Sequence, residues 1–423
     1  MRACLIIPPA SFLQDDWVFP PLGVLRVGAV LEEAGHEVVV VHGSDEIPSA
    51  DVYGITATTP QMPAAMEERQ GRTILGGAHA TLVAASARRG SFRGVLALAD
   101  LLANFSCVVA GDGELAIHDA LAGGTGLLDA DVEHSKYYVQ NQDHLPLPAR
   151  HLIDLDSYKY LIDGKRSTSM ITQLGCPFGC GFCGGRYSRF YRRVRRRSIG
   201  AILREVEHLI DLGYEGIMFL DDELNIALDL VLLMERLENY HLALRGFARA
   251  SLFTEQQANS MVKAGFKEIL FGFESGSDRM LTNMQKGSVE DNTRAFQVAR
   301  EAGLRVKALM SIGHPGESEE TVKETAEWLV EQAPDEFDLT IVTPYPGSPY
   351  WDDADYTSEE WIYTAPSGDK LHQVDSDYLQ EAVWYKGVPG KYFSHVYTDH
   401  LTPADLVYLR DSTDTAVREV LYP

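Results

Sequence analysis

One short loop constrains the fold of this chain more than any other part of its sequence. Residues 175–183 read GCPFGCGFC, so Cys176, Cys180 and Cys183 form the pattern C-x3-C-x2-C directly after an apolar run. Three thiolates this close together can each bind one iron of a cubane iron–sulfur cluster and leave a fourth iron open. A three-ligand zinc site and three free cysteines are the alternatives, but no fourth Cys or His follows at the short spacing that zinc normally uses. The loop therefore predicts a 4Fe–4S cluster.

The first 125 residues alternate the patterns of strands and helices. Apolar runs that predict strands lie at residues 3–7, 37–41, 52–56, 73–75 and 107–110. Helical spacing between them favours an α/β fold with a parallel, doubly wound sheet. Ligands of such sheets bind at the carboxyl ends of the strands. Small and polar residues stand at those ends, and the candidates are Thr56, Thr58, Thr59, Gly76, Gly77, His79 and Gly111.

From residue 167 to residue 347 the alternation resumes with longer units. Strands are predicted at residues 168–174, 216–220, 244–250, 268–273, 306–312 and 338–343. Six strand–helix units predict an open (β/α)6 barrel, a partial TIM barrel with its chemistry at the carboxyl ends of the strands. Residues 126–166 are mixed and polar and predict an interdomain linker. Residues 348–423 are rich in Tyr and Asp and predict a small α+β extension with a helix near residues 403–419.

The cysteine spacing and the order of motifs over residues 167–347 resemble the radical S-adenosylmethionine (radical SAM) superfamily. Residues 1–125 resemble the cobalamin-binding domain that precedes the barrel in one subclass, which carries short motifs similar to PPLG, GITATT, GGAHAT and GDGE. The resemblance implies an enzyme that reductively cleaves S-adenosylmethionine at a 4Fe–4S cluster. The resulting 5′-deoxyadenosyl radical would then modify a small molecule.

Three functions are compatible with this resemblance. Cobalamin-dependent C-methylation is the one that it favours, because most relatives of this layout transfer a methyl group to an unactivated carbon. A cobalamin-independent radical dehydratase, epimerase or oxidoreductase, which would keep the N-terminal domain as a scaffold, is the first alternative. A non-catalytic, cluster-bearing redox sensor is the second, but it leaves the motifs after the barrel strands without a role.

The resemblance also implies roles for residues near the cluster loop. Phe182 would lie beside the adenine of S-adenosylmethionine, although simple loop packing also explains an aromatic residue there. Arg249, at the end of the third barrel strand, would form a forked pair with the methionine carboxylate. Asp222 and Glu223 would lie near the methionine amino group, unless the acidic run that begins at Asp221 only forms a solvated loop end.

Two further strand ends carry residues that the resemblance assigns to the nucleoside of S-adenosylmethionine. Glu274 or Ser275, in the motif GFESG, would bond the ribose hydroxyls, because a carboxylate accepts well from two neighbouring hydroxyls. Gly313, in the motif GHPGE, would let the adenine approach the backbone. Glu317, in the same motif, is more simply explained as a cap of the following helix.

Cobalamin would use the small residues at the strand ends of residues 1–125. Thr56, Thr58 and Thr59 can hydrogen-bond its nucleotide tail, and Gly76 and Gly77 leave room for that tail. This site is the expected position of the cofactor in the cobalamin-dependent reaction.

The sequence departs from those cobalamin domains that ligate cobalt through His. Their Asp-x-His-x-x-Gly loop corresponds here to residues 8–23, which contain no His. His79 is better explained as a backbone-bonded residue at a strand end than as a cobalt ligand. Trp17 and Phe19 are large enough to fill the cavity instead, in which case the domain would be only a scaffold.

The charge of the chain bears on its partners. The net charge of −24 would repel phosphate backbones, so general nucleic-acid binding is not expected. Residues 186–198 break this trend with seven arginines in the run RYSRFYRRVRRRS. This run could hold a phosphate or carboxylate of an anionic substrate. A solvated stretch with salt bridges to the acidic surface is the interpretation that such a run favours.

Cysteine usage and hydropathy indicate the compartment. Cys4 and Cys107 lie in separate apolar strands as buried free thiols, which indicates a reducing cytoplasm. No apolar run is long enough to cross a bilayer, and the first residues predict a strand and not a signal peptide. The resemblance implies two partners, a small-molecule substrate and an electron donor such as ferredoxin or flavodoxin.

Overall fold

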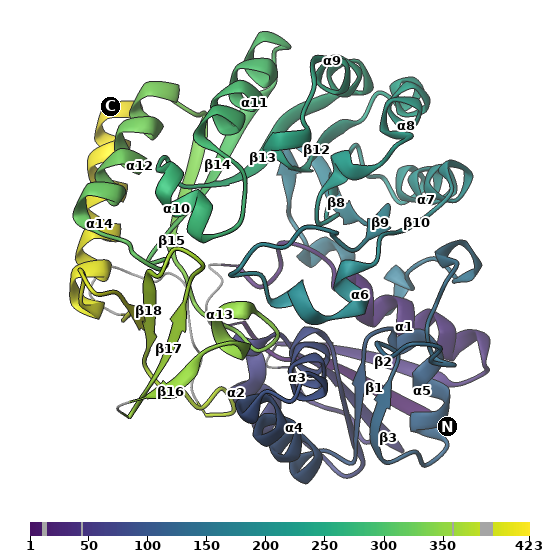
Figure 1. The fold of residues 1–423 in the computed structure, drawn as a ribbon. Helices are drawn as coiled ribbons and strands as arrows, with labels where there is room; N and C mark the ends of the chain where they lie inside the picture. The colour runs from purple at the N-terminus through teal and green to yellow at the C-terminus, as the bar shows by residue number, and fades with distance from the viewer. Residues whose placement is uncertain (11–14, 44, 358, 381–391) are drawn as a thin grey trace.

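The computed structural model of the protein describes residues 1–10, 15–43, 45–357, 359–380 and 392–423. Two α/β units lie side by side, and the C-terminal segment runs along both of them (Figure 1). The predicted α/β class is confirmed. None of the helices in these ranges is long and apolar enough to cross a membrane.

The N-terminal unit is built on a six-stranded parallel sheet of order β2-β1-β3-β4-β5-β6. Its strands are β1 (Arg2–Ile7), β2 (Glu37–His42), β3 (Val52–Thr56), β4 (Thr73–Gly76), β5 (Cys107–Ala110) and β6 (Gly126–Asp129). Its helices are α1 (Leu22–Glu33), α2 (Met62–Glu67), α3 (Ala78–Arg88), α4 (Phe92–Asn104) and α5 (Gly113–Leu121). Alternate side chains of the strands enter two separate cores, one packed under α1 and α5 and the other under α2, α3 and α4.

The boundary predicted for the N-terminal unit is too early. Strand β6 lies within the predicted linker of residues 126–166, yet it pairs with β5 along its whole length. Its side chains are only half-buried because it is the edge strand of the sheet. A short edge strand lacks the long apolar run that makes central strands recognisable in a sequence.

The second unit is a curved sheet of order β15-β14-β13-β12-β11-β8-β7 that does not close into a barrel. Its parallel strands are β8 (Lys165–Met170), β11 (Gly216–Phe219), β12 (Ala243–Ala248), β13 (Phe266–Glu274), β14 (Arg305–Ile312) and β15 (Glu336–Ile341), and β7 (Leu161–Ile162) is antiparallel to β8. Its helices are α7 (Ile199–Asp211), α8 (Leu230–Leu237), α9 (Glu255–Ala264), α10 (Asp278–Asn283), α11 (Val289–Glu301) and α12 (Glu319–Gln332).

Local sequence sets the ends of the barrel helices. The hydroxyls of Ser198, Thr254 and Ser288 accept hydrogen bonds from backbone N–H groups of the first turns of α7, α9 and α11. Such caps satisfy donors that have no partner within the helix. Helix α9 stops at Gly265, whose φ of +106° is costly for other residues. Because β8 and β11 to β15 are parallel, the loops that follow these strands meet at one edge of the sheet.

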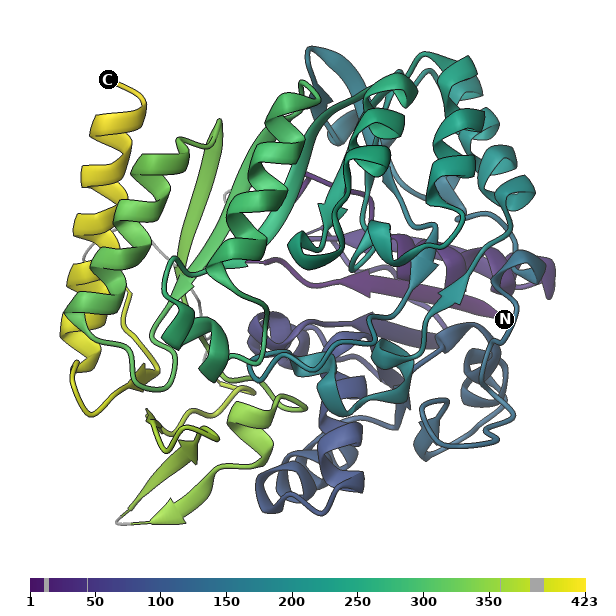
Figure 2. The ribbon, with the colours of Figure 1, turned by 45° about the horizontal axis from the view of Figure 1, so that its top comes forward.

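The C-terminal extension joins both units. It contains α13 (Pro349–Asp352), an antiparallel sheet of β16 (Asp355–Thr357), β17 (Glu360–Thr364), β18 (Lys370–Gln373) and β19 (Val396–Tyr397), and α14 (Pro403–Leu421). Helix α14 lies beside α12 and β15 at the open edge of the barrel (Figure 2). Residues 381–391 of the predicted extension lie outside the described residues.

Candidate functional site

The loop of residues 175–183, called the cluster loop here, follows the short strand β9 (Gln173–Leu174) and precedes α6 (Arg189–Arg192). The N–H of Cys176 donates to the carbonyl of Tyr191 at 2.7 Å, and the N–H of Gly181 donates to the carbonyl of Met284 at 2.8 Å. The guanidinium of Arg192 donates to the carbonyls of Phe178 and Pro177. These bonds hold the backbone of the loop through contacts with two other segments, α6 and the residue that follows α10.

The three thiols of the loop differ in burial. Cys180 is buried, Cys176 is half-buried and Cys183 is exposed. Burial raises the pKa of Cys176 to about 11, so metal binding would have to displace its proton. Within the described part of the chain, no three Cys, His, Asp or Glu side chains converge on one ion position.

Charged side chains surround the buried side of this loop. Arg249 Nη1 lies 3.9 Å from Cys180 Sγ and 3.9 Å from Glu223 Oε1, and its guanidinium stacks on the ring of Phe178. Lys286 Nζ lies 2.6 Å from Glu274 Oε1. Burial raises the pKa of Glu223 to about 7. Desolvated cations and carboxylates beside a metal loop can bind the charged ends of an amino-acid cofactor.

Lys286 is the residue of this site that sequence reasoning missed. It lies in the loop between α10 and α11, at no strand end and in no motif used above. Only its conjunction with Glu274 and the ring of Phe182, 5.7 Å from its Nζ, identifies it as part of the site. Phe182 also makes an edge contact with the ring of His314.

The acidic run after β11 is only partly solvated, because Asp222 is exposed while Asp221 is buried and Glu223 is half-buried. Asp221 is 1% exposed and accepts from the N–H groups of Thr172 at 2.6 Å and Gln173 at 3.0 Å. Asp222 accepts from the N–H of Gly175 at 3.0 Å. These carboxylates fasten the cluster loop to β11, and Glu223 remains the acid nearest to Arg249.

The structure corrects the roles expected for Ser275 and Glu317. The hydroxyl of Ser275 is 3.0 Å from that of Thr325 and accepts from the N–H of Ser277, so it points away from the cluster loop. Glu317 does not cap α12, because Ser318 is the capping residue. Its buried carboxylate instead accepts from the N–H of Gly313 at 3.0 Å.

Gly313 lies at the end of β14, as predicted. Its φ is +84°, and a Cβ atom there would meet Ile341, Leu406 and Val396. The glycine therefore makes room for side chains of the barrel edge and the C-terminal extension. The approach of adenine to its backbone stays a prediction.

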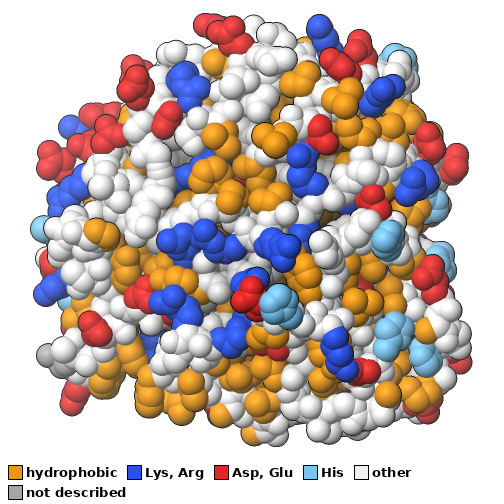
Figure 3. Space-filling view, turned by 45° about the vertical axis from the view of Figure 1, so that its right-hand side comes forward, with side chains coloured by type: hydrophobic (Ala, Val, Ile, Leu, Met, Phe, Trp, Pro, Cys, Tyr) orange, Lys and Arg blue, Asp and Glu red, His pale blue; other side chains and the backbone are white. Residues whose placement is uncertain are grey.

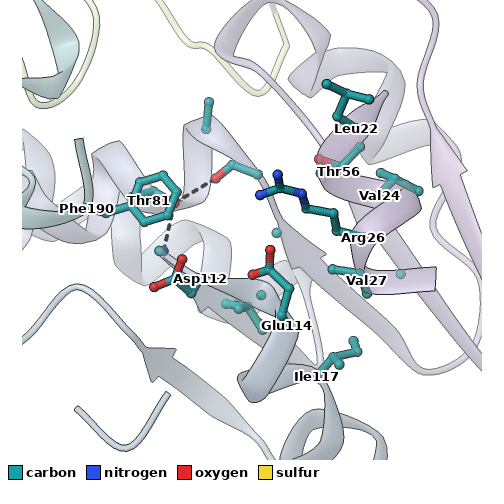
Figure 4. Close-up of a pocket in the computed structure, with 18 of the residues that line it drawn as sticks. Leu22, Val24, Arg26, Val27, Thr56, Thr81, Asp112, Glu114, Ile117 and Phe190 are labelled. Atoms are coloured by element: carbon teal, nitrogen blue, oxygen red, sulfur yellow. Dashed lines mark hydrogen bonds between the residues drawn. The ribbon is translucent and has the colours of Figure 1, made fainter. Parts of the chain in front are cut away.

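A cavity of about 220 Å³ separates the strand ends of the N-terminal sheet from the cluster loop (Figure 4). Four predicted residues line it, namely Thr56, Gly76, Gly77 and Gly111. Thr81 closes its floor by donating to the carbonyl of Gly77 and accepting from the N–H of Gly111. The opposite wall consists of Ile171, Leu174, Phe190 and Tyr191, which flank the cluster loop.

The inner part of this cavity is apolar, with buried charges at one side. Leu22, Val24 and Val27 of α1 face it, and Arg26 and Glu114 extend toward one another across it (Figure 4). Burial raises the pKa of Glu114 and lowers the pKa of Arg26. The space would suit an apolar ring system that also carries polar groups.

Three predicted residues do not line this cavity. Thr58 bonds Gln61, and Thr59 lies 3.0 Å from Nδ1 of His79. His79 is on α3, is 1% exposed and has its pKa lowered to about 3 by burial, so it is a neutral core residue. Its ring faces Tyr378 of the C-terminal extension and not the strand-end cavity. The sequence motif placed these residues near the strand ends but could not predict which way they point.

The aromatic residues suspected of filling the cavity lie elsewhere. Trp17 makes edge contacts with His42 and Tyr158, and Phe19 packs against Tyr160. Neither residue lines the strand-end cavity. The described side chains therefore leave space between the two units.

The arginine run is not a solvated stretch throughout. Arg195 is 4% exposed and donates to Asp112 at 2.6 Å, and Arg197 is 8% exposed and donates to Glu205 at 2.5 Å. These two pairs join the segment after the cluster loop to the N-terminal unit and to α7. The remaining arginines are more exposed, and Lys and Arg side chains gather across the middle of the face in Figure 3. The prediction of salt bridges is correct, but the central pairs are buried.

Comparisons with known proteins agree with this geometry. Residues 170–329 match the model of the radical SAM superfamily. An uncharacterized methyltransferase of Pyrococcus horikoshii is 28% identical over 395 residues, which cover 83% of this chain and 83% of that protein.

Two solved structures have a similar fold. The radical S-adenosylmethionine methyltransferase TsrM of Kitasatospora setae, with cobalamin and a 4Fe–4S cluster bound, superimposes with a TM-score of 0.60 at 18% identity, over 82% of this chain and 76% of that one. The cobalamin-dependent S-adenosylmethionine radical enzyme OxsB, with aqua-cobalamin bound, gives a TM-score of 0.59 at 16% identity, over 79% of this chain and 53% of that one.

Proposed function

The chain belongs to the radical SAM superfamily and is an enzyme, and from this premise we propose that it is a cobalamin-dependent methyltransferase of a small molecule. Cys176, Cys180 and Cys183 would ligate the 4Fe–4S cluster. Cobalamin would occupy the cavity at the strand ends of the N-terminal sheet. The relative of Pyrococcus horikoshii supports the methyltransferase assignment by its name, and the fold shared with TsrM supports the cobalamin site.

One observation carries this proposal: the cluster loop and the strand-end cavity share a wall. The carbonyl of Tyr191 accepts the N–H of Cys176, while Tyr191 also lines the cavity. Leu174, two residues before Cys176, lines it as well. A group held at the strand ends would therefore lie beside a cofactor held at the loop. Methyl transfer needs this proximity, because one substrate carbon must meet both cofactors.

The residues around the loop would bind and orient S-adenosylmethionine. Arg249 would pair with its methionine carboxylate, and Glu274 would accept from its ribose hydroxyls. Lys286 would hold the Glu274 carboxylate in place through its 2.6 Å contact with Oε1. The chemistry that the bound cluster supplies is the electron that breaks the sulfonium C–S bond. The apolar cavity walls would keep water from the reacting carbon.

The decisive experiment uses protein produced in cells supplied with cobalamin and then reconstituted with iron and sulfide under anaerobic conditions. We expect a cobalamin absorption spectrum at about one equivalent, and release of 5′-deoxyadenosine on addition of dithionite and S-adenosylmethionine. Release of 5′-deoxyadenosine by protein that retains no cobalamin would favour the radical dehydratase, epimerase or oxidoreductase alternative. No cleavage of S-adenosylmethionine at all would leave only the redox sensor.

A further inference from the structure

A chain of buried hydrogen bonds connects Glu274 to the C-terminal extension. Ser311 Oγ lies 3.0 Å from Glu274 Oε2 and 2.8 Å from His314 Nε2. His314 Nδ1 lies 3.2 Å from the hydroxyl of Tyr350. Ser311 is 8% exposed, and both His314 and Tyr350 are 0% exposed. Bulk water therefore does not compete for these bonds, and each depends on its protein partner.

The direction of these bonds follows from the carboxylate at one end. The Glu274 carboxylate pairs with Lys286 through Oε1 and accepts from the Ser311 hydroxyl at Oε2. Ser311 Oγ then accepts from Nε2–H of His314. Burial lowers the pKa of His314 to about 3, which keeps its imidazole neutral with a single N–H. Nδ1 of His314 therefore accepts a hydrogen bond from the Tyr350 hydroxyl.

Tyr350 also contacts the cluster loop. Its N–H donates to the carbonyl of Gly181 at 3.2 Å, between two of the three cysteines. A Cβ atom on Gly181 would lie 2.9 Å from the Tyr350 ring, so the glycine admits the ring. Helix α13 of the extension thus packs directly on the loop. The hydroxyl of its Tyr350 points toward His314, just after the end of β14.

Glu274 needs external support because its backbone is unusual. Its φ is +64°, in the left-handed region that non-glycine residues rarely adopt. The pairing of β13 with β14 also shifts in register between Gly272 and Glu274. Residues in such conformations persist only where surrounding contacts hold them, and they cluster at functional sites. Lys286 and Ser311 supply those contacts to the two carboxylate oxygens.

We propose that Tyr350 is a positioning residue for S-adenosylmethionine, which acts through His314 and Ser311 on the carboxylate of Glu274. This inference rests on the proposed function, in which Glu274 accepts from the ribose hydroxyls. It gives the C-terminal extension a part in the cofactor site. Without the Tyr350 hydroxyl, His314 is free to move its proton to Nδ1, and Ser311 then loses its donor.

The test is a double-mutant cycle with Tyr350→Phe and Ser311→Ala in the reconstituted holoenzyme. The measurement is the dissociation constant of S-adenosylmethionine, from calorimetric titration without reductant. We expect each single variant to bind about five-fold more weakly, the loss of roughly one hydrogen bond. In the Ser311→Ala background, Tyr350→Phe should add almost nothing, because the connection to Glu274 is already broken.

Two controls separate positioning from packing. Tyr363 is a buried tyrosine whose ring centroid lies 4.8 Å from that of Tyr350, but it takes no part in the hydrogen bonds from Tyr350 to Glu274. Tyr363→Phe should therefore leave binding unchanged. Ser311→Thr keeps a hydroxyl and should retain most of the affinity. Iron content should match the wild type in every variant.

Four outcomes would overturn the inference. Additive effects of Tyr350→Phe and Ser311→Ala, or an effect of Tyr363→Phe equal to that of Tyr350→Phe, would show a packing role and overturn the inference. Unchanged binding by Tyr350→Phe would overturn it as well. If the wild type itself does not bind S-adenosylmethionine, the proposed function fails first and this inference fails with it.

Discussion

Lys286 Nζ lies 2.6 Å from Glu274 Oε1, and this pair joins the loop after α10 to the end of β13 beside the cluster cysteines. Both side chains are only 14% exposed. A Cβ atom on Gly272 would lie within 3 Å of both charged groups, so the glycine leaves room for the pair. The site therefore contains a carboxylate whose charge is matched before any cofactor binds.

Removal of the lysine should impair cofactor binding. Lys286→Met leaves the largely buried Glu274 carboxylate without its counterion and without the contact that fixes the orientation of its Oε1. We expect the dissociation constant of S-adenosylmethionine to rise about ten-fold, equivalent to ~1.4 kcal/mol. Lys263→Met, on the exposed side of α9, is the matched control and should bind normally. Equal affinities of the two variants would exclude Lys286 from the site.

The cluster cysteines should be distinguishable from the remaining two. Cys176→Ala, Cys180→Ala and Cys183→Ala should each abolish cleavage of S-adenosylmethionine, because each iron needs its thiolate. Cys4→Ala and Cys107→Ala should retain cleavage, since both residues lie in the N-terminal sheet, away from the loop. The checks are iron content and 5′-deoxyadenosine release. Near-normal cleavage by a triple variant of the loop would contradict the central assignment.

The strand-end cavity offers a direct test for cobalamin. Gly76 lines it, its φ is outside the left-handed region, and no heavy atom lies within 4 Å of the position of its Cβ. Gly76→Phe should therefore fit the backbone and fill the cavity, and bound cobalamin should fall at least ten-fold in the absorption spectrum. Gly76→Ala, which adds one methyl group, should retain the cofactor. Full cobalamin occupancy of Gly76→Phe would place the cofactor elsewhere.

Glu317 should make stability depend on pH. Burial raises its pKa to about 7 from an ordinary value of 4.5. The folded chain thus keeps this proton between those values while the unfolded chain releases it, so stability should fall as pH rises from about 4.5 to 7, by at most ~3 kcal/mol. Denaturant titrations should show a flatter profile for Glu317→Gln. The exposed Glu320→Gln is the control and should retain the wild-type slope.

The features predictable from the sequence are those that depend on near neighbours in the chain. The spacing of Cys176, Cys180 and Cys183 places three thiols on one loop whatever surrounds them. The alternation of apolar runs with helical spacing reflects the geometry of each strand and helix, so the α/β class and the strand-end positions of Thr56, Arg249 and Glu274 followed. The short edge strand β6 was not predicted, because a short, half-buried strand carries little hydrophobic pattern.

Only the tertiary structure decided which of these residues meet. Lys286 reaches Glu274, and Tyr350 reaches His314, across long stretches of chain, so no local pattern marks either contact. His79 lies in the core, and Arg195 is buried against Asp112, and neither position could be read from the sequence. Burial and side-chain direction depend on how separate segments pack, and that packing sets both the charge state and the partners of each group. The sequence by itself determined the α/β class and the spacing of the three thiols on one loop, and packing decided which other residues meet at the site.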